Sequence, residues 1–522
     1  MRLLLLLLCS LYFLLPNLRA QDYSVDWGPV YKKVGGRNGV ARLFKLDHPN
    51  YYLLTGDYRK GSLAKFNLQH RLLDTQPIDK RVGKDRLFLS HFARTVTGDY
   101  AFYISFDRKN KFIKMYASNF RGDRLSPPQK VYEHPFTAYR YFGVLGLNDG
   151  FNQDVTRRLQ VSSNDSLVVF VNPLSNKDQE RTEQLAIVVF DADFKPIWDK
   201  QQDFEYNDQN IRFEQVILDD AGTVFLLARV YHQRKRPKGP DGKPNGLPDY
   251  DYRIFRVTAD DFQEYELHLG DRIAPTNAGL FFPKAAQQQF LVAGIYTDEG
   301  YESGGKGVFF ARGEVEDGSI QKNIHPFDQT FLADLISEER LRNDQGLENS
   351  FKIDRLIEFS DGSFSFLAED RYVMTSSSTN SAGRTRSRNI YHSGDVIIPH
   401  FSAEGAFENI QRVEKSFRSL LPQNISYSFA LYRDKVHLVF NDMKTAEERR
   451  DIKSADGGKK GKFYTDLAII NNAGEIETQT NLFNNRDIAL SFDSRLFKFS
   501  GSTLIIGTSS PRKYSLGILE LE

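Results

Sequence analysis

The stretch FEQVILDDAGTVFLLARVY, residues 213–231, ends one apolar run at Asp-Asp-Ala-Gly and begins another at once. The stretch IDRLIEFSDGSFSFLAEDRY, residues 353–372, has the same layout, with an apolar residue nine positions before the glycine and an alanine six positions after it. Glycine in such a turn supplies the positive φ that other residues avoid. We therefore predict two strands joined by a tight turn through Gly222 and Gly362, and the recurrence indicates a repeated unit.

The apolar strand that follows this turn can be found eight times along the chain. A third apolar strand comes after it, and a Gly, Asp or Asn turn leads into a more polar fourth strand. Four antiparallel strands with the most apolar pair in the middle describe a blade that is buried on both faces, and such blades stack around an axis. The sequence thus predicts an all-β protein, a β-propeller of about eight four-stranded blades. Seven blades or a pair of β-sandwiches stay open as alternatives. The eight second strands are expected at residues 51–56, 100–106, 167–172, 224–231, 290–296, 364–372, 436–441 and 503–508.

The two ends of the chain complement each other. The last unit stops after its third strand, at residues 514–522, and residues 23–33 (YSVDWGPVYKK) can supply the missing fourth strand. Pairing these segments would close the ring and leave no free blade edge. We therefore expect the N-terminal strand to close the propeller.

One segment, residues 328–346, departs from the β pattern. Apolar residues recur at helical spacing from Phe331 to Ile336, Asp328 can act as the N-cap and Gly346 can end the helix. We predict a short helical insertion over 328–346 that packs its apolar side, Phe331, Leu332, Leu335 and Ile336, on the propeller rim. A mobile lid over the pore is the alternative.

Residues 1–20, MRLLLLLLCSLYFLLPNLRA, have the pattern of a secretory signal peptide. The apolar run is shorter than the roughly 20 residues that span a bilayer. We expect residues 21–522 to form a single exported domain, periplasmic or secreted, with no transmembrane segment after signal cleavage. Cys9 is the only cysteine, so cleavage would leave no disulfide, thiol nucleophile or thiolate metal ligand.

Two adjacent segments carry a resemblance to known proteins. They are GDVIIPHFSAEGAFENIQRVEKSF, residues 394–417, and YSFALYRDKVHLVFND, residues 427–442. The chain resembles a group of uncharacterised secreted proteins of Bacteroidota over about residues 350–445. The resemblance implies an exported, propeller-like protein of an envelope-rich bacterium, and it brings no activity and no functional residues.

The sequence lacks the short motifs of several enzyme classes. It contains no His-Glu-x-x-His, no Gly-x-Ser-x-Gly and no phosphate-binding Gly-x-x-x-x-Gly-Lys-Ser/Thr. Residues 218–225, LDDAGTVF, resemble the aspartate-box turn of sialidases, which is a turn element and supports the fold rather than catalysis. We assign no catalytic residue, no metal site and no cofactor. Calcium is the one open possibility, in the loop 239–252, with Asp241, Asn245, Asp249 and Asp251 as oxygen donors.

Charge is distributed unevenly along the predicted repeats. The eight loops between second and third strands, which emerge on one face of a propeller, sum to about +9, whereas the whole chain carries +1. Such a face attracts anionic partners, and arginine can bind carboxylates or phosphates with two hydrogen bonds. The alternative is that long exposed loops are simply charged and soluble. The candidate ligand-binding residues are Arg384, Arg386, Arg388, Arg234, Lys235, Arg236, Lys238, Lys459, Lys460 and Lys462.

The leading functional hypothesis is a monomeric, non-enzymatic binding or scaffold protein of the bacterial envelope. Its basic loop face would bind an anionic glycan, a lipid headgroup or an acidic envelope protein, and export argues against nucleic acid. A carbohydrate-active enzyme, hydrolase or lyase, with its site at the pore is the first alternative, because propellers host such sites. A structural subunit of a secretion or motility assembly is the second.

Overall fold

The computed structural model describes most of the chain after residue 22. The prediction of a signal peptide at residues 1–20 lies outside the described residues. No helix among the described residues is long and apolar enough to cross a membrane. The described residues are 23–33, 40–56, 61–78, 80–107, 109–135, 159–174, 182–207, 209–232, 246–283, 288–298, 303–316, 318–379, 381, 385–443, 463–484 and 490–521.

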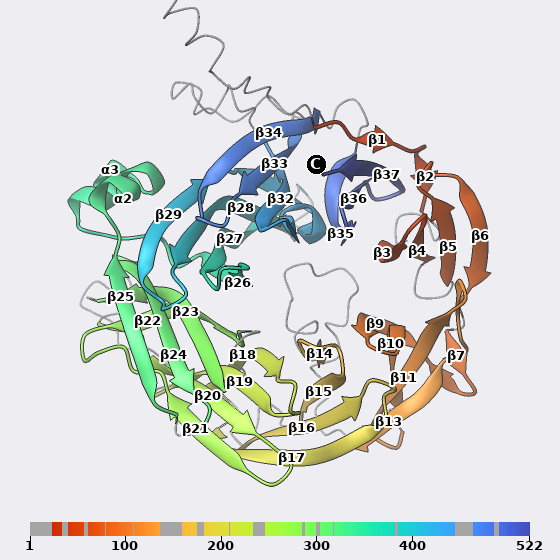
Figure 1. Ribbon diagram of the computed structural model, residues 1–522, viewed down its shortest axis with the longest axis horizontal. Helices are drawn as coiled ribbons and strands as arrows, with labels where there is room; N and C mark the ends of the chain where they lie inside the picture. The colour runs from red at the N-terminus through yellow and green to blue at the C-terminus, as the bar shows by residue number, and fades with distance from the viewer. Residues whose placement is uncertain are drawn as a thin grey trace, which may run out of the picture.

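The described strands form eight antiparallel sheets of four or five strands, arranged as blades around a central pore (Figure 1). The predicted β-propeller is therefore confirmed. From the innermost strand outward, blade 1 holds β3 (Val40–Asp47), β4 (Asn50–Gly56), β5 (Gly61–Asn67) and β6 (Leu72–Pro77); blade 2 holds β9 (Phe88–Thr95), β10 (Gly98–Asp107), β11 (Phe112–Arg121) and β13 (Gln129–Pro135), with β12 (Arg124–Leu125) at its side. Blade 3 holds β14 (Leu159–Val161), β15 (Leu167–Pro173), β16 (Thr182–Asp191) and β17 (Pro196–Asn207); blade 4 holds β18 (Ile211–Leu218), β19 (Val224–Tyr231), β20 (Tyr250–Val257) and β21 (Phe262–Glu266).

The second half of the chain continues the same order. The small hairpin of β7 (Arg81–Val82) and β8 (Asp85–Arg86) stands outside this scheme, between blades 1 and 2. Blade 5 holds β22 (Ala274–Phe281), β23 (Gln289–Thr297), β24 (Gly307–Glu314) and β25 (Ile320–Pro326); blade 6 holds β26 (Phe351–Glu358), β27 (Phe364–Thr379), β28 (Thr385–Phe401) and β29 (Phe407–Val413), with β30 (Phe417–Ser419) also paired to β28. Blade 7 holds β31 (Ser428–Tyr432), β32 (Lys435–Asp442), β33 (Tyr464–Ile470) and β34 (Ile476–Asn484); blade 8 holds β35 (Ser491–Ser500), β36 (Thr503–Ser509) and β37 (Lys513–Glu520).

All eight predicted second strands are present, as β4, β10, β15, β19, β23, β27, β32 and β36. The turns that lead into β19 and β27 pass through Gly222 and Gly362, whose φ values are 87° and 83°. In the first turn, the Asp219 carboxylate accepts hydrogen bonds from the backbone N–H groups of Ala221 and Thr223, at 2.9 and 2.7 Å. The opening sequence pattern is therefore the turn between the first and second strands of a blade, as predicted.

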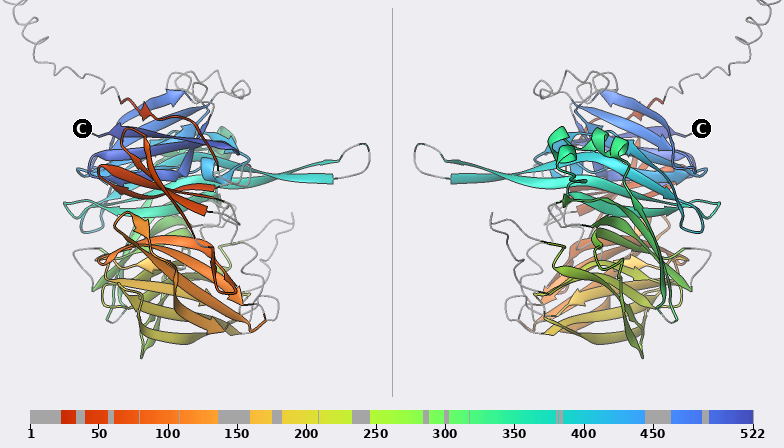
Figure 2. Two further views of the ribbon diagram at one scale, coloured as in Figure 1. Left: turned by 90° about the vertical axis from the view of Figure 1, so that its right-hand side faces the viewer. Right: turned by 90° about the vertical axis from the view of Figure 1, so that its left-hand side faces the viewer.

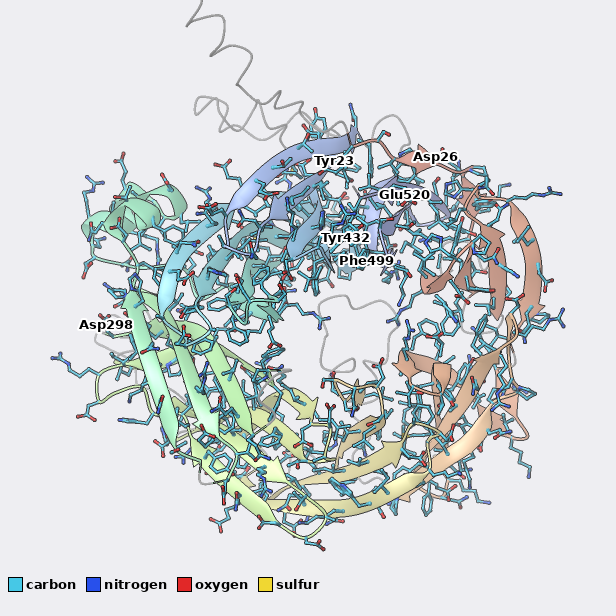
Figure 3. The ribbon with its side chains drawn as sticks, viewed as in Figure 1. Tyr23, Asp26, Asp298, Tyr432, Phe499 and Glu520 are labelled. Atoms are coloured by element: carbon cyan, nitrogen blue, oxygen red, sulfur yellow. The ribbon has the colours of Figure 1, made fainter. Side chains whose placement is uncertain are left out.

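The N-terminal segment closes the ring. β1 (Asp26–Trp27) and β2 (Tyr31–Lys32) pair antiparallel with β37, with Asp26 opposite Ile518 and Tyr31 opposite Tyr514. Figure 3 shows Asp26 close to Glu520, so both ends of the described chain belong to blade 8. The predicted closure by residues 23–33 is confirmed.

The core lies between the blades. Eight clusters of buried apolar residues occur in the described chain, and each joins two neighbouring sheets. The cluster with Leu43 and Leu516, for example, joins blades 1 and 8. Because both faces of a blade are covered, its two middle strands are apolar without interruption, which explains why they were recognisable in the sequence.

The helical insertion differs from the prediction. Instead of one helix over 328–346, α2 (Gln329–Leu335) and α3 (Glu338–Arg342) follow each other. Asp328 caps α2 as expected, but Ile336 is extended and the Ser337 side chain accepts from Arg340 N–H to start a second helix. Gly346 ends neither helix, and its N–H donates to the Ser303 carbonyl.

The insertion lies on the outside of the ring and does not cover the pore (Figure 1). Leu332 is buried, and Phe331, Leu335 and Ile336 pack against the cluster between blades 5 and 6. Packing on the rim is therefore confirmed, and the alternative of a lid over the pore is wrong.

Candidate functional site

One group of charged residues lies at one end of the pore, in blades 4 and 6. In blades 4 and 6 the start of the innermost strand pairs with the end of the second strand, so Arg212 lies opposite Arg229 and Lys352 opposite Glu369. This is the end from which the loops between second and third strands emerge. We call the following group the pore-mouth cluster: Glu214, Arg229, Tyr252, Lys352, Asp354, Arg371 and Tyr427.

A β-bulge in each of two innermost strands introduces a carboxylate into this cluster. The pairing of β18 with β19 shifts between Phe213 and Gln215, and the pairing of β26 with β27 shifts between Ile353 and Arg355. The residues left over by the two shifts are Glu214 and Asp354. A bulge bends its strand and redirects the extra side chain, so the backbone irregularity itself positions these two acids.

In blade 4 the bulged acid meets a buried arginine. Arg229 Nε lies 2.8 Å from Glu214 Oε1, and Arg229 Nε also donates to the Tyr252 hydroxyl at 2.8 Å. The Tyr252 hydroxyl in turn donates to Glu214 Oε2 at 2.9 Å. Burial opposes the charge of Arg229, but the neighbouring Tyr252 and Glu214 raise its pKa. Arg229 therefore stays cationic, and its ion-pair partner Glu214 belongs to the same blade.

In blade 6 the arginine and the acids are arranged differently. Arg371 pairs with the bulged Asp354 and lies 3.4 Å from Glu369 through its Nε. Glu369 is fully buried, pairs with the equally buried Lys415, and accepts from Ser393 Oγ at 2.6 Å. Asp354, Glu369 and Arg371 are therefore paired with side chains from β26, β27, β28 and the segment after β29.

Lys352 is the cation of the cluster that lacks a carboxylate of its own. It is half-buried, and its Nζ donates to the Asn349 carbonyl at 3.2 Å, with no acidic oxygen within ion-pair distance among the described residues. Burial, together with repulsion from Arg229, Arg212 and Arg371, lowers the pKa of Lys352 to about 8, although the charge of Glu214 offsets part of this effect. An anion placed beside this ammonium group would relieve that repulsion.

Tyr427 adds an unsatisfied polar group to the cluster. The side chain is 7% exposed, and its hydroxyl has no hydrogen-bond partner among the described residues. Burial, with the negative charges of Asp354 and Glu369, raises the pKa of Tyr427, so the phenol stays protonated. A buried hydroxyl without a partner is costly, and a bound ligand or water would satisfy it.

The described innermost strands contain more basic than acidic residues. Figure 1 shows innermost strands such as β18, β26 and β35 facing the pore. In blades 8 and 1, burial and repulsion from Arg495 lower the pKa of Arg42 to about 10. The eight innermost strands contain eight basic residues, Arg42, Lys45, Arg94, Arg212, Lys352, Arg355, Arg495 and Lys498, and five acidic ones, Asp47, Glu214, Asp354, Glu358 and Asp493.

Of the ten predicted ligand-binding residues, the structure describes Arg386 and Arg388. Both are exposed on β28, in a two-stranded ribbon that projects from the face with the pore-mouth cluster (Figure 2). Arg371 is followed directly by this ribbon, so the two regions adjoin. The other eight residues, Arg384, Arg234, Lys235, Arg236, Lys238, Lys459, Lys460 and Lys462, lie outside the described residues, and their role stays a prediction.

The predicted calcium loop is described only in part. Asp241 and Asn245 lie outside the described residues. Asp251 lies 3.0 Å from His232 and 3.4 Å from Arg253. Among the described residues no three His, Cys, Asp or Glu side chains group together as metal ligands. Calcium therefore stays a prediction.

The sequence analysis did not identify the pore-mouth cluster, although a signal for it exists. Seven residues after the turn glycine, the apolar second strands of blades 4, 6 and 8 carry Arg229, Glu369 and Thr508. A polar residue that recurs at the same position of apolar strands indicates buried polar groups, which need hydrogen-bond or ion-pair partners nearby. What the sequence does not give is which of these positions come together.

This chain has distant likenesses to solved structures. No protein-family model and no curated protein matches the sequence. The β-propeller domain of the trilobed protease from Pyrococcus furiosus is 9% identical, with 89% of this chain and 97% of that chain covered and a TM-score of 0.35. The periplasmic gluconolactonase PpgL of Pseudomonas aeruginosa is 10% identical, with coverage of 87% and 96% and a TM-score of 0.35. An oligogalacturonate lyase in complex with manganese is 9% identical, with coverage of 96% and 97% and a TM-score of 0.38. At these identities the likeness concerns the β-propeller fold alone.

Proposed function

We propose that this β-propeller binds an anionic ligand, carrying a carboxylate or phosphate group, at the pore-mouth cluster. The observation that carries the proposal is Lys352, a half-buried cation influenced by Arg212, Arg229 and Arg371 that has no acidic ion-pair partner in the described part of the chain. Arg229 and Arg371 are held by Glu214 and Asp354. The ligand would thus meet a rigid, positively charged site.

The physical reason is electrostatic complementarity. Cations that line a concave site of low dielectric act on an anion more strongly than cations in water. Lys352 of the cluster is influenced by the charge of the exposed Arg212 outside it, and Tyr427 offers a hydroxyl for one hydrogen bond. Arg386 and Arg388 on the adjacent ribbon add to the positive field of the same face. We propose export to the bacterial envelope as the setting, because acidic glycans and lipid headgroups there present carboxylates and phosphates.

The test is calorimetric titration of the mature protein with a uronic-acid oligosaccharide, inorganic phosphate and glycerol phosphate, with a neutral oligosaccharide as the reference. We expect one of the anions to bind, and we expect raised salt to weaken the binding. Lys352→Gln should weaken it at least tenfold. The matched control is Lys195→Gln, which removes the same charge from an exposed turn between the third and fourth strands of blade 3. Equal affinities of the two variants, or equal binding of the neutral sugar, would contradict the proposal.

A carbohydrate-active enzyme at the same site is the second candidate. The observation that favours it is the protonated phenol of Tyr427, which has no hydrogen-bond partner among the residues that the structure describes and is influenced by the carboxylates of Asp354 and Glu369. A phenol and a carboxylate can act as general acid and base. Acidic polysaccharides should then be cleaved, with new reducing ends or an unsaturated product absorbing in the ultraviolet. Tyr427→Phe should stop this cleavage without weakening anion binding by more than a few-fold. The absence of product from every acidic polysaccharide that binds would exclude the enzyme.

A further inference from the structure

The middle strands of blade 6 continue far beyond the blade. β27 and β28 are 16 and 17 residues long, and their outer halves, 372–379 and 385–392, form a two-stranded ribbon that projects along the axis of the ring (Figure 2). At about 3.3 Å per residue, eight residues reach roughly 25 Å. Every described residue from Tyr372 to Thr379 and from Thr385 to Asn389 is exposed.

The two faces of the ribbon differ, because side chains alternate along a strand. One face carries a ladder of polar pairs, with hydrogen bonds of Thr375 to Asn389 at 3.0 Å, Ser377 to Ser387 at 3.1 Å and Thr379 to Thr385 at 2.9 Å. The other face carries Tyr372 stacked on His392, then Met374 opposite Ile390, then Arg388 and Arg386 opposite serines. No Asp or Glu occurs from residue 371 to residue 394, so these arginines have no carboxylate within the ribbon.

The ribbon also has an open edge. β30 pairs with Tyr391, His392 and Ser393 of β28, and then its chain leaves the edge at Leu420, which is 57% exposed. Beyond that point, residues 385–390 pair with β27 alone among the described strands. A strand edge with unpaired backbone groups is a template for another strand, and peptide recognition by strand addition uses such an edge.

The pattern of charge selects the kind of partner. A second copy of this chain, paired along the same edge, would bring Arg386 and Arg388 against arginines, and like charges on opposing strands repel. Insertion into a lipid bilayer would require apolar residues at the far end, whereas Met374 and Ile390 lie near the base and the arginines lie further out. An acidic polypeptide in extended conformation would complement the arginines with its charge and the open strand edge with its backbone hydrogen bonds.

We propose that the ribbon binds an extended acidic segment of another protein, which adds as a strand along Thr385–Ile390. Carboxylates on alternate residues of that segment would lie opposite Arg386 and Arg388, while apolar side chains contact Leu420 and Ile390 at the base. The inference goes beyond anion binding at the pore mouth and uses none of the residues of that cluster, so each proposal can fail without the other.

The test uses a fluorescent peptide of about eight residues with glutamate at alternate positions, titrated with the mature chain and followed by anisotropy. Two control peptides accompany it. One replaces glutamate by glutamine, and the other replaces the intervening residues by proline, which cannot donate to a sheet. We expect binding of the glutamate peptide alone, at least tenfold weaker in the Arg386→Gln/Arg388→Gln double variant, and unchanged in Lys352→Gln and Lys195→Gln.

Hydrogen exchange distinguishes strand addition from simple charge attraction. Bound peptide should slow amide exchange within residues 385–390 and leave the far strand of blade 6, β29, unchanged. Equal binding of the proline peptide, unchanged exchange at 385–390, or no binding of the glutamate peptide would overturn the proposal. A concentration-dependent dimer that the peptide does not dissociate would also overturn it, because the edge would then belong to a second copy.

Discussion

Blades 4 and 6 share a sequence pattern, but they neutralise their buried charges in different ways. In both, a turn glycine with positive φ precedes the second strand, and a bulge in the innermost strand introduces an acid, Glu214 or Asp354. Seven residues after the glycine, blade 4 has Arg229 and blade 6 has Glu369. In blade 4 opposite charges therefore meet within one blade.

In blade 6 the same geometry would bring two carboxylates together. The structure supplies Arg371 and the buried Lys415 instead, the second from the segment after β29. The turn and the apolar alternation therefore specify a blade. The residue seven positions after the turn glycine determines which neighbouring segment must supply a counter-ion.

The largest effect is expected where blade 6 depends on a distant counter-ion. Lys415→Met leaves Glu369 buried without its ammonium partner, and breaking a buried ion pair by removing one member costs about 3–5 kcal/mol. Urea unfolding measures this loss. The double variant Lys415→Met/Glu369→Gln should recover part of it, because no uncompensated charge then remains. A loss below about 1 kcal/mol in the single variant would show that Glu369 is satisfied by its serine partners and Arg371.

In blade 4 the corresponding change should cost less. Arg229→Met removes the partner of Glu214, but the side chain of Glu214 is 13% exposed and keeps the hydrogen bond from Tyr252. We expect a loss of about 1–3 kcal/mol in the free energy of unfolding. Urea unfolding of this variant beside Lys415→Met compares the two blades directly. If Arg229→Met proved the more damaging of the two, the contrast drawn between the blades would be wrong.

The shared turn should respond similarly in both blades. Gly222→Ala and Gly362→Ala force a Cβ into a left-handed conformation, which costs about 1–2 kcal/mol. The added methyl at 362 would lie 3.3 Å from the Ala403 methyl, whereas at 222 the nearest atom would be Leu167 Cδ1 at 3.6 Å. We therefore expect Gly362→Ala to be slightly the worse. Thermal unfolding measures both, and a stabilising effect of either would contradict the assigned turn.

The smallest effect is expected from a change of pH, which alters the charge of Lys352 in the pore-mouth cluster and with it the affinity for anions. The pKa of Lys352 is lowered to about 8, so this ammonium group is charged below pH 8 and loses its charge as the pH rises. Anion affinity should fall about tenfold between pH 7 and pH 9, which is about 1.4 kcal/mol. Lys33 also has a pKa of about 8, so the assignment needs variants. Lys352→Gln should remove the pH dependence and Lys33→Gln should keep it, with calorimetry as the readout.

Much of the fold could be predicted from the sequence, because it rests on local and periodic signals. Gly222 and Gly362 mark their turns by the φ that glycine alone adopts easily, and the second strands of the blades are apolar throughout because both faces are covered. The closing strand was recognisable because the last repeat lacks a fourth strand. The helical insertion was predicted as one helix, since the spacing of Phe331 to Ile336 does not show that Ser337 caps a second helix.

The candidate site could be predicted only in part. Arg386 and Arg388 were found because a run of exposed arginines without acids is visible in the chain itself. Lys352, Arg229 and Tyr427 were not found as a group, because they come from blades 6, 4 and 7, and the one signal, a charged Arg229 within an apolar strand, does not show which residues it meets. Their significance depends on bulges and on contacts between strands that are far apart in the chain.

The repeat, the turns, the closing strand and the positive charge of the arginine run follow from the sequence, since each of these depends on residues close together or on a recurring period. The tertiary structure alone decided that Glu214 and Asp354 would be redirected by bulges, that Lys415 would neutralise Glu369, and that Lys352 would stand among arginines. The physical reason is that pairing and repulsion between charges depend on distance in space, and a closed ring brings together residues that the chain keeps more than a hundred positions apart.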